Sequence, residues 1–185
     1  MINTHSHYSL SIFINLKNVL FCVVLIFILY ATFGCSAMKS SQKAPEFDIT
    51  LYQTEDYSEG DLYRFTREKS LPIVLNFWFP SCPPCVAEMP EINNLYKEHK
   101  NDVEVVGIQL VGLDSVDDGK NFVKDTSISY AVGSDPDGSI SVAYGVSGFP
   151  TTFFIDSKGY VLKTWEGAIN ADQLKQNINL ILSND

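Results

Sequence analysis

The chain has few of the side chains that bind metals and haem. It contains four cysteines and three histidines in 185 residues, and beyond residue 36 only Cys82, Cys85 and His99 remain. A structural zinc site needs four cysteine or histidine ligands, so these three candidates are too few. A c-type haem attachment needs a histidine directly after the second cysteine, where this chain has Val86. The sequence therefore predicts neither a zinc site nor covalently bound haem.

Positive charge is scarce as well. The net charge is −9, all 22 acidic residues follow Cys35, and Lys17 is the one basic residue before it, so residues 36–185 carry about −10. Such a surface repels nucleic-acid phosphates and anionic lipid headgroups. The composition therefore excludes nucleic acid as a partner and assigns any membrane attachment to the N-terminal leader.

That leader contains an uncharged apolar stretch from Val19 to Phe33, preceded by Lys17. Its length is typical of a signal peptide and short for a membrane span. Gly34 before Cys35 resembles a bacterial lipobox, which predicts lipidation of Cys35. An uncleaved anchor and simple cleavage near Ala37 are the alternatives, and all three export the domain that follows.

The chain divides into a leader at 1–35, a polar linker at 36–45 and one domain at 46–185. Strand and helix signals alternate in the domain, which is typical of an α/β fold. The expected strands are 73–79, 103–110, 130–132, 152–156 and 160–165. The expected helices are 82–100, 115–126, 139–144 and 170–182. Capping-box spacing of Ser115 with Asp118, and of Asn170 with Gln173, marks the starts of two of them.

The sequence Cys82-Pro83-Pro84-Cys85 follows the apolar strand 73–79 and begins the helix 82–100. Two intervening residues allow the sulfur atoms to meet at disulfide geometry. A cysteine at a helix N-terminus is favoured as a thiolate, with a pKa that falls from about 8.5 to roughly 3.5–7.5. We therefore expect Cys82 to be the reactive thiolate and Cys85, one turn further along, to be buried.

Two segments together resemble a known family. Trp78-x-x-x-Cys-Pro-Pro-Cys and the segment from Phe149 to Asp156, which begins Phe-Pro-Thr-Thr, look like the TlpA/ResA-like branch of thioredoxin-fold proteins. The resemblance covers 46–185 and implies an exported, membrane-tethered thiol–disulfide oxidoreductase. It also implies a central mixed sheet flanked by helices, with the insertion of this branch at about 114–146.

Carried over position by position, the resemblance implies a redox-active disulfide in which Cys82 attacks and Cys85 resolves. It makes Pro150 a cis-proline beside the dithiol, with the backbone of Phe149 pairing with substrate. No cofactor or metal is implied beyond the disulfide. The residues assigned to substrate binding are Trp78, Phe149 and Thr151.

Three further positions bear on the chemistry. Glu88 matches the active-site glutamate of the branch and is a candidate proton acceptor for Cys85, the alternative being a solvated acid in the first helical turn. Asn76 stands where thioredoxin has a buried aspartate. Ser81 stands where most relatives have tryptophan, which predicts a flatter surface around Cys82 and leaves substrate preference open.

The sequence also bears on three other functions. A peroxiredoxin-like thiol peroxidase needs threonine or serine where the chain has Phe79, and a late arginine where none follows Arg67. A Cu(I)-binding module would use the two thiolates together with a distal histidine, which this chain lacks. A disulfide-forming oxidase or isomerase stays open, because direction depends on reduction potential and partner.

The expected function is disulfide exchange with protein substrates on the outer face of the bacterial cytoplasmic membrane. The resemblance implies reduction of cysteines in apocytochrome c before haem attachment, with electrons from a membrane thiol-transfer protein.

Overall fold

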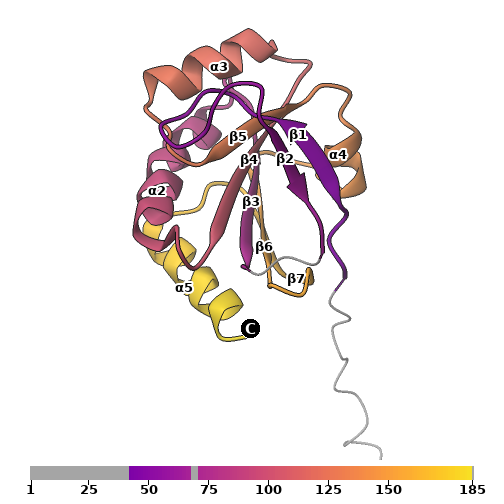
Figure 1. Ribbon diagram of the computed structural model, residues 1–185, viewed down its shortest axis with the longest axis vertical. Helices are drawn as coiled ribbons and strands as arrows, with labels where there is room; N and C mark the ends of the chain where they lie inside the picture. The colour runs from indigo at the N-terminus through magenta and orange to yellow at the C-terminus, as the bar shows by residue number, and fades with distance from the viewer. Residues whose placement is uncertain (1–41, 68–70, 185) are drawn as a thin grey trace, which may run out of the picture. The chain divides into compact units, whose positions relative to one another are not determined.

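A five-stranded mixed sheet forms the centre of the domain, in the order β5-β4-β3-β6-β7 (Figure 1). The computed structural model describes residues 42–67 and 71–184, so the predicted leader, Cys35 and most of the predicted linker lie outside the described residues. The strands of this sheet are β3 (Ile73–Trp78), β4 (Glu104–Leu110), β5 (Ala131–Asp135), β6 (Thr151–Ile155) and β7 (Val161–Glu166).

The strand directions make the sheet mixed, as the resemblance implied. β3 pairs in parallel with β4, and β4 with β5, whereas β3–β6 and β6–β7 are antiparallel. All six residues of the central strand β3 are buried. Because side chains alternate along a strand, Val74 and Trp78 join one apolar core and Leu75 and Phe77 the other.

Helices cover both faces of the sheet. The core that contains Val74 and Trp78 includes buried residues of α2 (Pro83–His99), α3 (Val116–Asp125) and α5 (Ala171–Leu182). The core on the opposite face is covered by α4 (Ser139–Ala143) and by a separate β-hairpin (Figure 1). The α/β thioredoxin-like architecture predicted from the sequence is therefore confirmed.

The hairpin is an element that the sequence analysis did not predict. Its strands, β1 (Phe47–Thr50) and β2 (Leu62–Phe65), pair antiparallel. Residues 42–45, which the sequence analysis assigned to the linker, pack against other parts of the domain. Ala44 is fully buried, its N–H donates to the Gly159 carbonyl over 2.9 Å, and the Pro45 carbonyl accepts from Tyr144. These residues thus belong to the folded domain.

Local signals fix the ends of two helices. Ser115 and Asp118 form a reciprocal capping box at the start of α3, and Asn170 and Gln173 form another at the start of α5. Both boxes were predicted from residue spacing.

The predicted insertion at about 114–146 contains α3, β5 and α4. No helix among the described residues is long and apolar enough to cross a membrane.

Candidate active site around the Cys82–Cys85 disulfide

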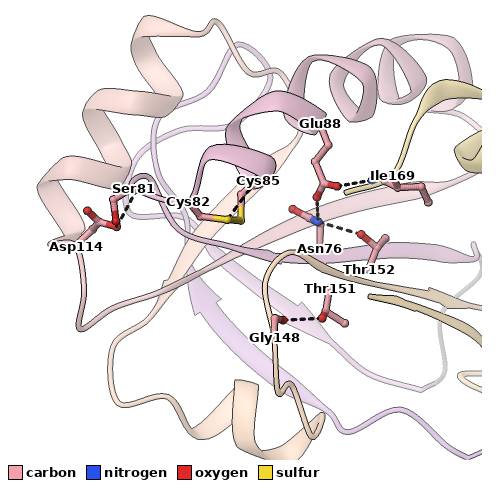
Figure 2. Close-up of a disulfide and its surroundings, with 10 residues drawn as sticks. All are labelled: Asn76, Ser81, Cys82, Cys85, Glu88, Asp114, Gly148, Thr151, Thr152 and Ile169. Atoms are coloured by element: carbon pink, nitrogen blue, oxygen red, sulfur yellow. Dashed lines mark hydrogen bonds between the residues drawn. A yellow bond between two sulfur atoms is a disulfide. The ribbon is translucent and has the colours of Figure 1, made fainter. Parts of the chain in front are cut away.

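Cys82 and Cys85 form a disulfide at the point where β3 leads into α2 (Figure 2). Cys82 is the N-cap of α2, and Cys85 lies in its first turn. Cys82 is 4% exposed and Cys85 is fully buried. Cys82 thus keeps a small exposed surface beside the exposed Ser81 and Pro83, whereas Cys85 has none.

The two prolines between the cysteines change the hydrogen bonding at this helix N-terminus. Pro83 and Pro84 have no backbone N–H, so two of the usual unpaired donors of the first turn are missing. The Cys85 N–H points to the sulfur of Cys82 over 3.3 Å, and the Val86 N–H bonds to the Cys82 carbonyl. Negative charge on Cys82 would thus be stabilised by one directed amide and by the helix dipole.

Glu88 lies on the inner side of the disulfide. It is only 2% exposed, so the alternative of a solvated first-turn acid is wrong. One carboxylate oxygen accepts from the Asn76 side-chain amide over 2.7 Å, and the other accepts from the Ile169 N–H over 2.9 Å. Asn76 also donates to the Thr152 hydroxyl over 3.0 Å. The carboxylate is therefore fixed between β3 and the loop before α5 (Figure 2).

Burial raises the pKa of Glu88 from 4.5 to about 7, and the hydrogen bonds from Ile169 and Asn76 offset part of that rise. Cys85 and Glu88 are three residues apart on α2, so their side chains leave the helix on the same face. A carboxyl group with a pKa near 7 can take or give a proton at neutral pH. The inner side of the disulfide thus carries a group suited to proton transfer.

Ser81 and Asp114 lie on the outer side of the disulfide. One oxygen of the Asp114 carboxylate accepts from both the backbone N–H and the hydroxyl of Ser81, over 3.0 and 2.7 Å (Figure 2). The loop after β4 is thereby fixed to the residue directly before Cys82. A second carboxylate consequently lies near the dithiol, at the partly exposed end of α2.

The loop before β6 contributes the remaining part of the site. Its Phe149–Pro150 peptide bond is cis, as the resemblance implied. Phe149 is partly buried, and its ring meets that of Phe79 at 5.2 Å in an edge-on contact. The Thr151 hydroxyl donates to the Gly148 carbonyl over 2.7 Å and so stabilises this loop (Figure 2).

Two of the predicted substrate-binding side chains are misassigned. Trp78 is fully buried, because strand alternation points it into the core beneath the helices, where it packs on Phe122 at 5.3 Å. Thr151 is 2% exposed and its hydroxyl bonds to the preceding loop. Neither side chain is available to a substrate, whereas Phe149 stays partly accessible.

Sequence reasoning missed three partners of the site. Thr152 was seen only as part of the motif, and the Ile169 N–H comes from a loop 81 residues after Glu88 with no sequence signal of its own. Asp114 was not connected with Ser81, 33 residues away. Ser81 itself is the sequence signal for the Asp114 contact, since serine leaves room for this hydrogen bond where most relatives have tryptophan.

Comparison with known proteins agrees with this geometry. The AhpC/TSA family pattern matches residues 40–164, more than half of the chain. The chain belongs to the AhpC/TSA family. Within it, the chain is 33% identical over 147 residues to the thiol-disulfide oxidoreductase ResA of Bacillus thuringiensis subsp. konkukian, covering 78% of this chain and 79% of that protein.

Two further relatives indicate the same enzyme class. The ResA protein of Bacillus subtilis strain 168 is 33% identical over 168 residues, which is 88% of each chain. The solved structure of the exposed lipoprotein thioredoxin Etrx1 of Streptococcus pneumoniae is 28% identical, with a TM-score of 0.65, and covers 74% of this chain and 99% of that one. The enzyme class is therefore that of the ResA-like thiol–disulfide oxidoreductases.

Proposed function

We propose that this enzyme reduces disulfides of exported proteins, with Cys82 as the attacking sulfur and Cys85 as the resolving one. The observation that carries the proposal is the asymmetry of the disulfide. Cys82 lies at the partly accessible helix N-terminus, whereas Cys85 is fully buried beside a carboxyl group of raised pKa.

The reaction has two sulfur exchanges. The Cys82 thiolate attacks one sulfur of the substrate disulfide, which breaks that bond, forms a mixed disulfide and releases the first substrate thiolate. The Cys85 thiolate then attacks the sulfur of Cys82, which forms the enzyme disulfide and releases the second substrate thiolate. Two electrons pass from the dithiol to the substrate, and an external dithiol must later return them.

Glu88 serves as the proton acceptor for Cys85 in this proposal. A buried thiol must lose its proton before it can attack, and the Glu88 carboxylate lies on the same face of α2 with its orientation fixed by Asn76 and Ile169. Because burial raises the Glu88 pKa to about 7, it can hold that proton at neutral pH and release it later.

The backbone of Phe149 is the proposed contact for substrate. Among the described residues, neither the N–H nor the carbonyl of Phe149 forms a hydrogen bond, while the Pro150 carbonyl next to it accepts from the Gly167 N–H. An extended peptide beside Cys82 could therefore pair with Phe149 as an added strand does. The ring of Phe149, packed edge-on against Phe79, would give this contact an apolar floor.

The proposed substrate is apocytochrome c with oxidised cysteines, as the resemblance to TlpA/ResA-like proteins implies, and the proposed electron donor is a membrane thiol-transfer protein. We place the enzyme on the outer face of the cytoplasmic membrane, attached through its leader, with Cys35 as the lipidation site. The lipobox-like Gly34-Cys35 pair and the name of the exposed lipoprotein relative support this location.

An insulin-reduction assay with dithiothreitol tests the redox function. The full chain should reduce insulin, and both Cys82→Ser and Cys85→Ser should lose turnover, while the leader variant Cys22→Ser serves as a control that keeps it. Peroxide consumption without disulfide reduction would favour a thiol peroxidase. Tight Cu(I) binding without turnover would favour a copper module.

The reduction potential tests the direction of electron flow. A reductant should have a potential nearer the thioredoxin value of about −270 mV than the strongly oxidising value of about −120 mV. Equilibration with glutathione buffers gives this value. A potential near the oxidising end would make the protein a disulfide-forming enzyme with the same fold and the same division of roles between its cysteines.

A further inference from the structure

A basic cleft lies at the end of the sheet away from the disulfide. Its volume is about 560 Å³, and its lining includes three cations and one acid. The lining residues are Lys43, Glu46, Thr66, Arg67 and Lys158. A local excess of positive charge is unexpected in a chain with a net charge of −9.

Two carboxylates lie next to the cleft cations, but both accept from backbone N–H groups. Glu46 accepts from the Arg67 N–H over 3.2 Å, and Asp156 accepts from the Lys158 N–H over 3.0 Å. Four other cations form salt bridges, namely Arg64 with Asp48, Lys97 with Glu55, Lys100 with Asp56 and Lys120 with Glu59. Within residues 42–67 and 71–184 the three cations of the cleft form no salt bridge, as is also true of Lys124, Lys163 and Lys175. Three cations against the one carboxylate of Glu46 leave the cleft with a net positive charge for an anion from outside the domain.

Neutral contacts hold these side chains instead. The Arg67 Nε donates to the Ala44 carbonyl over 3.0 Å, which leaves the two Nη groups for another acceptor. Gly159 lies against Arg67 so closely that an added Cβ would come within 3.0 Å of its side chain. Lys43 lies over the Tyr160 ring at 5.4 Å, and Lys158 donates to the Asn184 carbonyl over 3.0 Å. The cleft is thus partly organised before any ligand binds.

The strand register puts the cleft and the disulfide at opposite ends of the sheet. Ile155 pairs with Ile73 at the start of β3, and Lys158 follows Ile155 by three residues. Thr151 pairs with Phe77 near the other end of β3, five residues before Cys82. The segment before β1 runs along the turn between β6 and β7, where Lys43 forms a β-bridge with Tyr160 and the Ala44 N–H donates to the Gly159 carbonyl. The chain therefore enters the domain at the basic end.

The distance between the cleft and the leader is limited by the chain itself. Lys43 follows Cys35, the proposed lipidation site, by eight residues. A fully extended chain spans at most about 3.3–3.6 Å per residue, so Lys43 lies within about 30 Å of a membrane-bound Cys35. This step rests on the proposed attachment of the leader. Given that attachment, the cleft stays near the lipid surface.

We propose that this cleft binds the phosphate-bearing headgroup of an anionic membrane lipid. A guanidinium with free Nη groups suits phosphate oxygens, and two lysines add point charges beside it. Basic residues next to a membrane anchor are attracted to anionic lipids within a Debye length of the surface. The acidic remainder of the domain is repelled, so the Cys82 end is directed away from the membrane toward substrates.

Lysine labelling in nanodiscs tests this proposal. The full chain is placed in discs of phosphatidylcholine alone or with one third phosphatidylglycerol, and the acetylation rate of each lysine is measured by mass spectrometry. Lys43 and Lys158 should react at least about threefold more slowly in the anionic discs, and high salt should remove the difference. Lys124 and Lys175, which lie outside the cleft, are internal controls whose rates should not change.

A charge-neutralising pair of variants sharpens the test. Arg67→Gln should reduce the protection of Lys43 and Lys158, whereas Lys175→Gln, with the same change in net charge, should not. Insulin reduction by both variants checks that they are folded. Equal labelling rates in the two kinds of disc would overturn the proposal.

Two further outcomes separate the possible causes of failure. Inorganic phosphate is added to the chain in detergent without lipid. If it protects both lysines and phosphatidylglycerol does not, the cleft takes free anions and the lipid assignment is wrong. A chain that does not remain with the discs overturns the proposed leader attachment, and this inference with it. A chain that remains with them but labels equally overturns only the cleft.

Discussion

The two cysteines share one disulfide but lie in different surroundings. On the outer side, Cys82 is preceded by Ser81, whose N–H and hydroxyl both donate to the partly exposed Asp114. On the inner side, Cys85 shares a buried face of α2 with Glu88. Each carboxylate accepts two hydrogen bonds of about 3 Å, from Ser81 for Asp114 and from Asn76 and Ile169 for Glu88.

Burial is the main difference between these two carboxylates. Glu88 has lost its water and has a pKa of about 7 despite its two hydrogen bonds, because desolvation outweighs them. Hydrogen-bond counts alone would have suggested two equivalent groups. The comparison assigns proton transfer to the inner carboxylate and an electrostatic influence on Cys82 to the outer one.

The largest expected effect comes from removing the inner carboxylate. Glu88→Gln keeps the size of the side chain but removes the base, so the resolving step should slow by about a hundredfold above pH 7. The wild-type rate should rise with pH through about 7, the pKa of Glu88, and the variant should lose this rise. Rapid-quench measurement of mixed-disulfide decay gives the rate.

Glu91→Gln is the matched control for this experiment, because Glu91 lies on the exposed side of the same helix. It should resolve the mixed disulfide at the wild-type rate. If Glu88→Gln also resolves at the wild-type rate, Glu88 does not accept the proton of Cys85.

Glu88 should also make stability depend on pH. Its pKa is higher in the folded chain than the ordinary 4.5, so the folded state binds the proton more tightly and stability falls as pH rises from about 4.5 to about 7. The expected loss is about 3 kcal/mol in the free energy of unfolding. Urea unfolding of the oxidised chain at pH 4.5 and pH 8 should show this loss, and Glu88→Gln should remove it. An unchanged pH dependence in the variant would mean that Glu88 is not desolvated.

The smallest effect is expected on the outer side. Asp114→Asn keeps an acceptor for Ser81 but removes a negative charge near the N-terminus of α2, so alkylation of Cys82 at neutral pH should be about two- to fivefold faster. Asp117→Asn, in the exposed first turn of α3, is the control and should change little. A slower reaction of the Asp114→Asn variant would show that the hydrogen bond matters more than the charge.

The parts of the fold with periodic signals were predictable from the sequence. The apolar run at 73–79 and the two capping boxes predicted β3 and the starts of α3 and α5. The hairpin of β1 and β2 was missed because each strand has only four residues, and the exposed positions of β2 weaken its pattern. Short strands of this kind are stabilised by tertiary packing more than by local sequence.

The site likewise has parts that local motifs predict and parts that they do not. The dithiol, Glu88 and the cis-proline follow from local motifs, whereas the Ile169 and Asp114 contacts join segments far apart in sequence. Trp78 was misassigned because the motif fixes its identity but not the face of β3 on which it lies. Side-chain alternation from the buried Asn76 would have given the inner face.

Alkylation of the fully reduced chain with limiting iodoacetamide at pH 7 tests the division of roles most directly. Fragment mass spectrometry distinguishes modification of Cys82 from that of Cys85. Because Cys82 lies at the helix N-terminus and Cys85 is fully buried, Cys82 should be modified first and Cys85 should remain largely unmodified. Preferential modification of Cys85 would contradict the assignment of Cys82 as the attacking sulfur.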